Sequence, residues 1–297
     1  FETTLVRIPF EWNVAEPYTI GITVEDGTRF EKEVEAAAPA LELSLDLAIF
    51  FAIIGTYVGI IPVMIGLLWL PFIKKISKQK YHFFLALTAG LLLFLAIDSI
   101  EEAVEVSDEN LASSFNGTLL VATVTVLSFL GLYYAGNKLV SKANSSKFTK
   151  PVAIALMISI GIGLHNFGEG LAIGAAVGMG SIAFSTFLIV GFALHNTTEG
   201  LAIAAPMSRG KLMLGKLVAM GIIAGSPAIF GAWIGGFVYS PFTSVIFFGI
   251  GAGAIFQVIV VILKWIYDEN DQKLSTMAVV SGFAVGMSVM YLTSILV

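Results

Sequence analysis

The sequence predicts an all-α polytopic membrane protein with eight transmembrane helices. Hydrophobic residues make up 57% of the 297 residues, charged residues only 12%, and the mean hydropathy is +0.90. A soluble domain has about 25% charged residues, so lipid is the main solvent of this chain. The second observation is a series of apolar runs, each long enough for the roughly 20 residues of a spanning helix. We therefore expect membrane lipid around the chain and no nucleic-acid partner.

The order of the apolar runs and charges predicts the topology. By the positive-inside rule, connections that contain lysine and arginine lie in the cytoplasm. All 13 basic residues after residue 40 fall in the connections after the first, third, fifth and seventh runs. This pattern predicts a multi-pass protein of the cell membrane with both termini outside. We expect the spans at about residues 44–72, 82–106, 115–139, 151–178, 181–206, 211–238, 241–266 and 274–296.

Residues 1–40 differ in character and predict a small β fragment. They alternate in the strand period over residues 18–24 and 29–34, with Asp26 and Gly27 between the two runs. One hairpin cannot bury a core, so we expect the C-terminal strands of a larger extracellular β domain. The segment has no His, Met or Cys, which favours a role in folding or assembly over metal capture. The transmembrane domain then covers residues 41–297.

A repeated motif marks the fourth and fifth spans. Residues 164–175 read LHNFGEGLAIGA and residues 194–205 read LHNTTEGLAIAA, so nine of twelve positions are identical. Each copy has a histidine four residues before a glutamate, which puts both side chains on one face of a helix. An asparagine follows each histidine. The motif residues are His165, Asn166 and Glu169 in the first copy, and His195, Asn196 and Glu199 in the second.

The residue types in the motif indicate a site for a divalent metal ion. An ionisable residue at bilayer depth costs about 2.5 to 3.5 kcal/mol, so histidines and glutamates in adjacent spans need one another or a bound cation. Imidazole and carboxylate suit Zn²⁺, Fe²⁺, Mn²⁺, Co²⁺, Ni²⁺ and Cd²⁺, and a chain without cysteine cannot form a thiolate site. The alternative is a polar pair that joins two helices, and the second copy of the motif weighs against it.

Acidic residues crowd the outer end of the second span. Such a mouth concentrates cations, whereas the alternative is an ordinary solvated helix end. Asp98 lies about two turns inside the span, where a free carboxylate is costly, so we expect it on the path of the ion. The residues predicted to line this path are Asp98, Glu101, Glu102 and Glu105.

The sixth and seventh spans contain further polar residues. Pro227 removes one backbone hydrogen bond and predicts a kink in the sixth span near the depth of the motif. Ser226, beside it, and Gln257, in the seventh span, are candidate accessory ligands. The alternative for Gln257 is a hydrogen bond between helices.

With this motif and topology, residues 44–297 closely resemble the ZIP (ZRT/IRT-like) family of divalent metal transporters. The resemblance rests on the tandem HNxxEG motif in the fourth and fifth of eight spans. It implies a homodimer, and a mobile bundle of the first, fourth, fifth and sixth spans that slides against the others. It also implies the ligands: His165, Glu169, His195 and Glu199 at the centre, with Asn166 and Asn196 completing or bridging a second metal position.

The sequence departs from the family pattern at two places. Family members commonly have a glutamate near a proline of the sixth span, whereas residues 225–228 read Gly-Ser-Pro-Ala. A second metal position would then have fewer charges. Many eukaryotic members also have a histidine-rich loop after the third span, but residues 138–150 contain no histidine. A sensing role for this loop therefore has no support in the sequence.

We interpret the chain as a transporter and not an enzyme. Its cargo is a divalent transition metal, with Zn²⁺ as the first candidate, carried toward the cytoplasm. One alternative is an intramembrane metallohydrolase with the same ligands, although Asn166 stands where the His-Glu-x-x-His motif has its glutamate. The other alternative is a sensor that binds the metal without transporting it.

Overall fold

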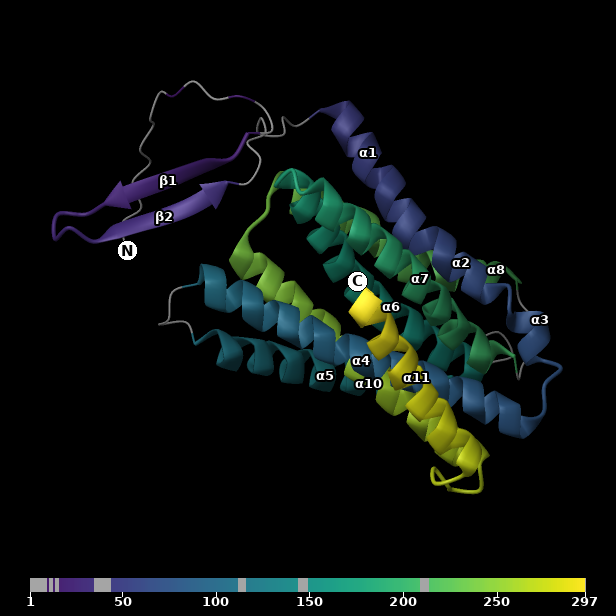
Figure 1. Ribbon diagram of the computed structural model, residues 1–297. Helices are drawn as coiled ribbons and strands as arrows, with labels where there is room; N and C mark the ends of the chain where they lie inside the picture. The colour runs from purple at the N-terminus through teal and green to yellow at the C-terminus, as the bar shows by residue number, and fades with distance from the viewer. Residues whose placement is uncertain are drawn as a thin grey trace.

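The apolar runs form the long helices of a bundle in the computed structural model (Figure 1). The structure describes residues 10, 13, 16–34, 44–111, 116–143, 149–208 and 214–296. The helical segments are α1 (Leu45–Gly55), η1 (Thr56–Ile60), α2 (Ile61–Leu67), α3 (Leu70–Ile73), α4 (Lys78–Asn110), α5 (Gly117–Ser141), α6 (Lys150–Gly178), α7 (Ile182–Met207), α8 (Leu214–Gly225), α9 (Pro227–Phe237), α10 (Pro241–Glu269) and α11 (Met277–Leu296).

Seven helical segments of the described chain are long and apolar enough to cross a membrane. Two of them join shorter helices: the first combines α1, η1, α2 and α3, and the sixth combines α8 and α9. The eighth expected span coincides with α11, whose residues Met277–Leu292 form a shorter apolar helix. By helix length and hydropathy, the chain is a multi-span membrane protein.

A cap moves the start of α4 away from the expected boundary. The helix begins at Lys78, ahead of residue 82, because the hydroxyl of Ser77 accepts a hydrogen bond from the backbone N–H of Lys80. It then continues through the acidic segment to Asn110. The two ends of the helix bundle therefore differ in charge. We call the end with Lys78 the lysine-rich end and the end with Asn110 the acidic end.

The N-terminal segment forms the hairpin that the sequence predicts. Strand β1 (Tyr18–Thr23) pairs antiparallel with β2 (Arg29–Val34). Gly27 in the turn has a φ of 85°, and the carboxylate of Asp26 accepts a hydrogen bond of 2.8 Å from the backbone N–H of Thr28. That hydrogen bond lowers the pKa of Asp26. The larger extracellular β domain stays a prediction.

The first and sixth spans are both interrupted in the middle. A π-helix, η1, lies between α1 and α2, and the sixth span breaks at Ser226 because Pro227 has no N–H to continue the helical hydrogen bonds. The kink predicted at Pro227 is thus confirmed. The two interruptions touch: a Cβ atom on Gly59 would lie 2.2 Å from the carbonyl oxygen of Gly225, so a larger residue does not fit.

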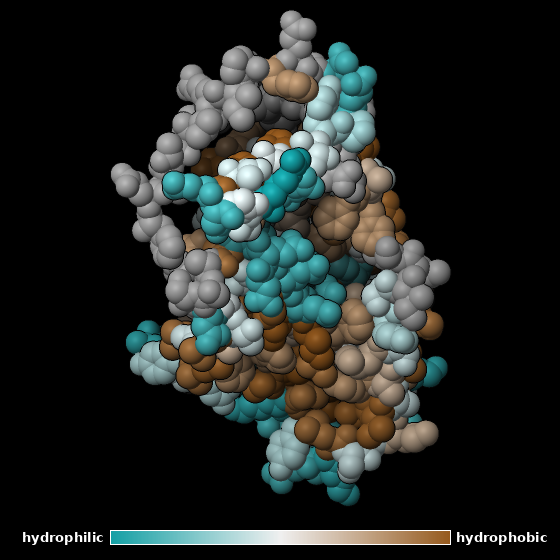
Figure 2. Space-filling view, turned by 60° about the vertical axis from the view of Figure 1, so that its left-hand side comes forward, coloured by the Kyte–Doolittle hydropathy of each residue, from teal (hydrophilic) through white to brown (hydrophobic). Residues whose placement is uncertain are grey.

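The helices pack in two groups. The motif group consists of the first span with α6, α7, α8 and α9, in which α6 packs along α7 and α9, and α7 along α2. The flanking group consists of α4, α5, α10 and α11, in which α4 and α10 pack together and contact α11 and α5. The main contact between the groups is that of α6 with α10. Hydrophobic side chains cover much of the flank of the bundle (Figure 2).

Small residues determine how closely α6 and α9 approach. A Cβ atom on Gly170 would lie 2.1 Å from the carbonyl oxygen of Ala228, and one on Gly231 would lie 2.1 Å from that of Phe167. Close contact between small residues is a common way to pack helices in a membrane. It keeps the helix that carries the first motif copy in a fixed position relative to the sixth span.

We expect Gly170→Ala to lower the melting temperature of the purified protein by several degrees, because the added methyl group pushes α6 and α9 apart. Gly131→Ala on α5 is the matched control, since nothing lies within 4 Å of the position of its Cβ. The control should keep or slightly raise the melting temperature, as alanine favours helix over glycine. Equal losses in both variants would contradict the packing role of Gly170.

Candidate metal centre

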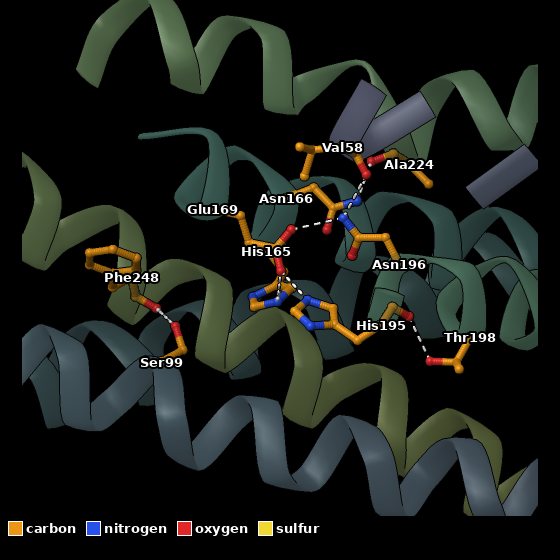
Figure 3. A network of polar contacts seen from close by, with 10 residues as sticks. All are labelled: Val58, Ser99, His165, Asn166, Glu169, His195, Asn196, Thr198, Ala224 and Phe248. Atoms are coloured by element: carbon orange, nitrogen blue, oxygen red, sulfur yellow. Dashed lines mark hydrogen bonds and ion pairs between the residues drawn. The ribbon is translucent and has the colours of Figure 1, made fainter. Parts of the chain in front are cut away.

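The two motif copies bring two histidines and one glutamate together. His165 and Glu169 lie one turn apart on α6, with 3.1 Å between His165 Nε2 and Glu169 Oε1. His195 on α7 reaches the same oxygen through its Nε2 atom (Figure 3). One potential ligand atom from each side chain lies within 4.8 Å of the others. These are the atoms that bind divalent transition metals in proteins, so this buried group can hold a metal ion.

Glu169 is the centre of this group. Its side chain is 3% exposed, and its second oxygen, Oε2, accepts a hydrogen bond of 2.9 Å from Asn196 Nδ2. Both carboxylate oxygens therefore have partners from the other motif copy. Hydrogen bonds of this kind fix the orientation of a ligand and tune its basicity. The arrangement requires α6 and α7 to lie side by side.

Glu199 is not one of the three residues of this group, although the sequence predicted it as a central ligand. It is 1% exposed, and neither of its carboxylate oxygens has a hydrogen-bond partner in the described structure. The Oδ1 atoms of Asn166 and Asn196 are also buried without partners. Buried polar atoms are nearly always paired, so this set of oxygen atoms favours an additional bound cation or water. The ligand role of Glu199 stays a prediction.

A cavity of about 550 Å³ extends from the His/Glu/His group toward the acidic end. Polar side chains of α4 line one wall, namely Asp98, Ser99 and Glu102. The hydroxyl of Ser99 donates a 3.1 Å hydrogen bond to the carbonyl of Phe248, which fastens α4 to α10 beside the cavity. The remaining wall is largely apolar and includes Phe94, Phe184, Phe187, Leu188 and Phe192.

The acidic residues of α4 divide into two sets. Asp98 and Glu102 line the cavity, whereas Glu101 and Glu105 are exposed and do not line it. Hydrophilic side chains gather toward the end of the bundle that carries the hairpin (Figure 2). Two of the four predicted path residues thus lie at the cavity, and the role of all four in guiding an ion stays a prediction.

The candidate accessory residues do not line the cavity. Ser226 lies at the break between α8 and α9. Gln257 is 2% exposed, and its Nε2 atom has no hydrogen-bond partner among the described residues, so both roles expected for it stay predictions. The cavity instead includes Thr198, which sequence reasoning missed. A signal was present, because Thr198 replaces Gly168 at the same place in the motif.

Side chains pack and form hydrogen bonds toward the lysine-rich end of the bundle. Tyr81 is fully buried in the main apolar cluster, donates a 3.2 Å hydrogen bond to the carbonyl of Ala205 and accepts a 2.9 Å bond from Trp265 Nε1. These bonds join α4, α7 and α10. Lys150 Nζ lies 3.1 Å from a carboxylate oxygen of Asp268, which also joins the start of α6 to α10 at the lysine-rich end.

A scan against models of known protein families finds no match for the chain, and a search of curated proteins finds no significant relative.

We expect Glu169→Gln to weaken Zn²⁺ binding about 100-fold or more, because the change removes the charge that both imidazoles contact. Isothermal titration calorimetry on the purified protein measures this loss. Glu101→Gln is the matched control, since it removes the same charge from an exposed position of α4 outside the cavity. Zn²⁺ binding that is unchanged in Glu169→Gln would exclude Glu169 as a ligand.

Proposed function

We propose that this chain transports a divalent transition metal, with Zn²⁺ as the first candidate, across the cell membrane toward the cytoplasm. The observation that carries the proposal is a buried His/Glu/His group at the inner end of an acidic cavity, inside a bundle of membrane-spanning helices. A structural metal needs no such access route, whereas a transported ion does. The resemblance of the tandem motif to the ZIP family supports the same function.

The proposed path starts at the acidic end. Negative charge at a cavity mouth raises the local concentration of cations, and Asp98 and Glu102 then bring the ion into the cavity. The ion loses water as His165, Glu169 and His195 coordinate it. The unpaired oxygens of Glu199, Asn166 and Asn196 offer a second position beside them.

Release toward the lysine-rich end requires a movement between the helix groups. The bond from Tyr81 to Ala205 joins the flanking group to α7, so it has to break before an ion can pass between them. The motif group contains the first, fourth, fifth and sixth spans, the set that the family resemblance assigns to a mobile bundle. We include in the proposal eight spans with α11 as the last, both termini outside, and a homodimer.

Metal influx into proteoliposomes tests the transport proposal. Wild-type protein should take up Zn²⁺ with saturable kinetics, and the double change His195→Ala with Glu199→Ala should abolish uptake. Parallel measurements with Fe²⁺, Mn²⁺ and Cd²⁺ rank the cargo. The double change Glu101→Gln with Glu105→Gln controls for charge outside the cavity and should retain uptake.

Two outcomes would replace the transport proposal. Zn²⁺ binding by the wild type without any flux would favour the sensor. Turnover of a lipid or peptide substrate that is lost in Glu199→Ala would favour the metallohydrolase, since that enzyme needs a general base beside the metal.

We expect Zn²⁺ affinity to fall as the pH drops from about 7.5 to 5. Metal ligation needs neutral imidazole, so protons compete with the metal for the ring nitrogens of His165 and His195 as the pH falls. Calorimetric titrations across this range measure the effect. An affinity that does not change with pH would argue against ligation by the histidines.

A further inference from the structure

The two asparagines of the motif make matching contacts with the two interrupted spans. Asn166 Nδ2 donates a 3.1 Å hydrogen bond to the carbonyl of Ala224, in the last turn of α8. Asn196 Nδ2 donates a 3.1 Å hydrogen bond to the carbonyl of Val58, inside the π-helix η1. Figure 3 shows both contacts on the side of the centre away from the histidine rings. Both asparagines are 0% exposed.

Both carbonyl groups belong to places where the regular hydrogen bonding of a helix is disturbed. Ala224 lies in the last turn of α8, just before the break at Ser226, and Val58 lies in a segment where the ladder has the π spacing. A backbone carbonyl that is buried away from water needs a donor. Each motif asparagine donates a hydrogen bond to a carbonyl at one of the two interruptions. Each asparagine lies on the same helix as the histidine and the glutamate of its own motif copy.

These bonds determine which way each amide group is turned. A reversed amide would place Oδ1 against a carbonyl oxygen, and two acceptors at hydrogen-bond distance repel each other. The Oδ1 atom of each asparagine must therefore point elsewhere, and both are buried without a partner in the described structure. The amide of Asn196 has a further task, because its Nδ2 also donates to Glu169 Oε2 at 2.9 Å.

We propose that Asn166 and Asn196 are positioning residues whose amide NH₂ groups fasten the first and sixth spans to the metal centre. This inference rests on the metal centre of the proposed function and adds a requirement to it. Each position needs a hydrogen-bond donor as well as an oxygen atom. Aspartate therefore cannot replace either asparagine, although a carboxylate attracts a divalent cation more strongly than an amide.

Substitution by aspartate separates this role from simple ligation. If the asparagines acted only through Oδ1, then Asn166→Asp and Asn196→Asp would bind Zn²⁺ at least as tightly as the wild type, because each adds a negative charge. If the NH₂ group is required, each variant places a carboxylate oxygen against a backbone carbonyl. The local structure then has to shift, and the affinity falls.

We expect Asn166→Asp and Asn196→Asp each to bind Zn²⁺ about 10-fold or more weakly, as expected for loss of a supporting hydrogen bond at a metal site. Each should also change the visible absorption spectrum of bound Co²⁺, which reports coordination geometry. Asn270→Asp is the matched control, because the Nδ2 of Asn270 also donates to a backbone carbonyl, that of Lys273, at a position outside the cavity. Wild-type affinity or tighter, with the wild-type Co²⁺ spectrum, would overturn the proposal.

A second measurement uses the metal-free protein. The chain has no cysteine, so spin labels can be attached to Tyr57→Cys on η1 and Leu194→Cys on α7, both at exposed positions. In an Asn196→Ser background, the shorter side chain cannot reach Val58, and the distance distribution between the labels should broaden. An unchanged distribution would overturn the role of Asn196 as a fastening residue. Because no metal is present, this result is independent of whether the protein transports one.

Discussion

The buried carboxylate of Glu169 is the constraint on which the centre of the molecule depends. An isolated charge at bilayer depth is costly, and here it is surrounded by the imidazoles of His165 and His195 and the amide of Asn196. Two of these three partners come from the other copy of the motif. The duplication therefore does more than double the number of ligands, because each copy completes the environment of the other. Close packing of α6 and α7 follows from this need.

Much of the fold follows from local properties of the sequence. Apolar length marks the spans, Asp26 and Gly27 mark the hairpin, and Pro227 marks the break in the sixth span. The helix α4 starts earlier than its apolar run because Ser77 caps it with a hydrogen bond. The hydropathy of the sequence does not reveal such a bond. The eighth span is shorter in the described structure than its apolar run suggests, since α11 begins only at Met277.

The site was harder to predict than the spans. An i, i+4 spacing shows that His165 and Glu169 share a face of one helix, but it does not fix how that helix is rotated against its neighbour. This rotation determines that Glu169 contacts both histidines and that Glu199 is not part of their group. The π-helix has no clear sequence signature, so the contact of Asn196 with Val58 could not be foreseen. Long-range hydrogen bonds such as that of Tyr81 depend on the completed fold in the same way.

The contact between Gly59 and Gly225 has a mechanical consequence. Two helix backbones meet there without side chains between them, so the junction has no rotamers that could repack into a second arrangement. The first and sixth spans are therefore in direct backbone contact, although more than 150 residues separate the two glycines in the chain. The wall between α7 and α4 is built differently, because large phenylalanine side chains line it. Two of the smallest residues of the protein thus determine how closely these two spans meet.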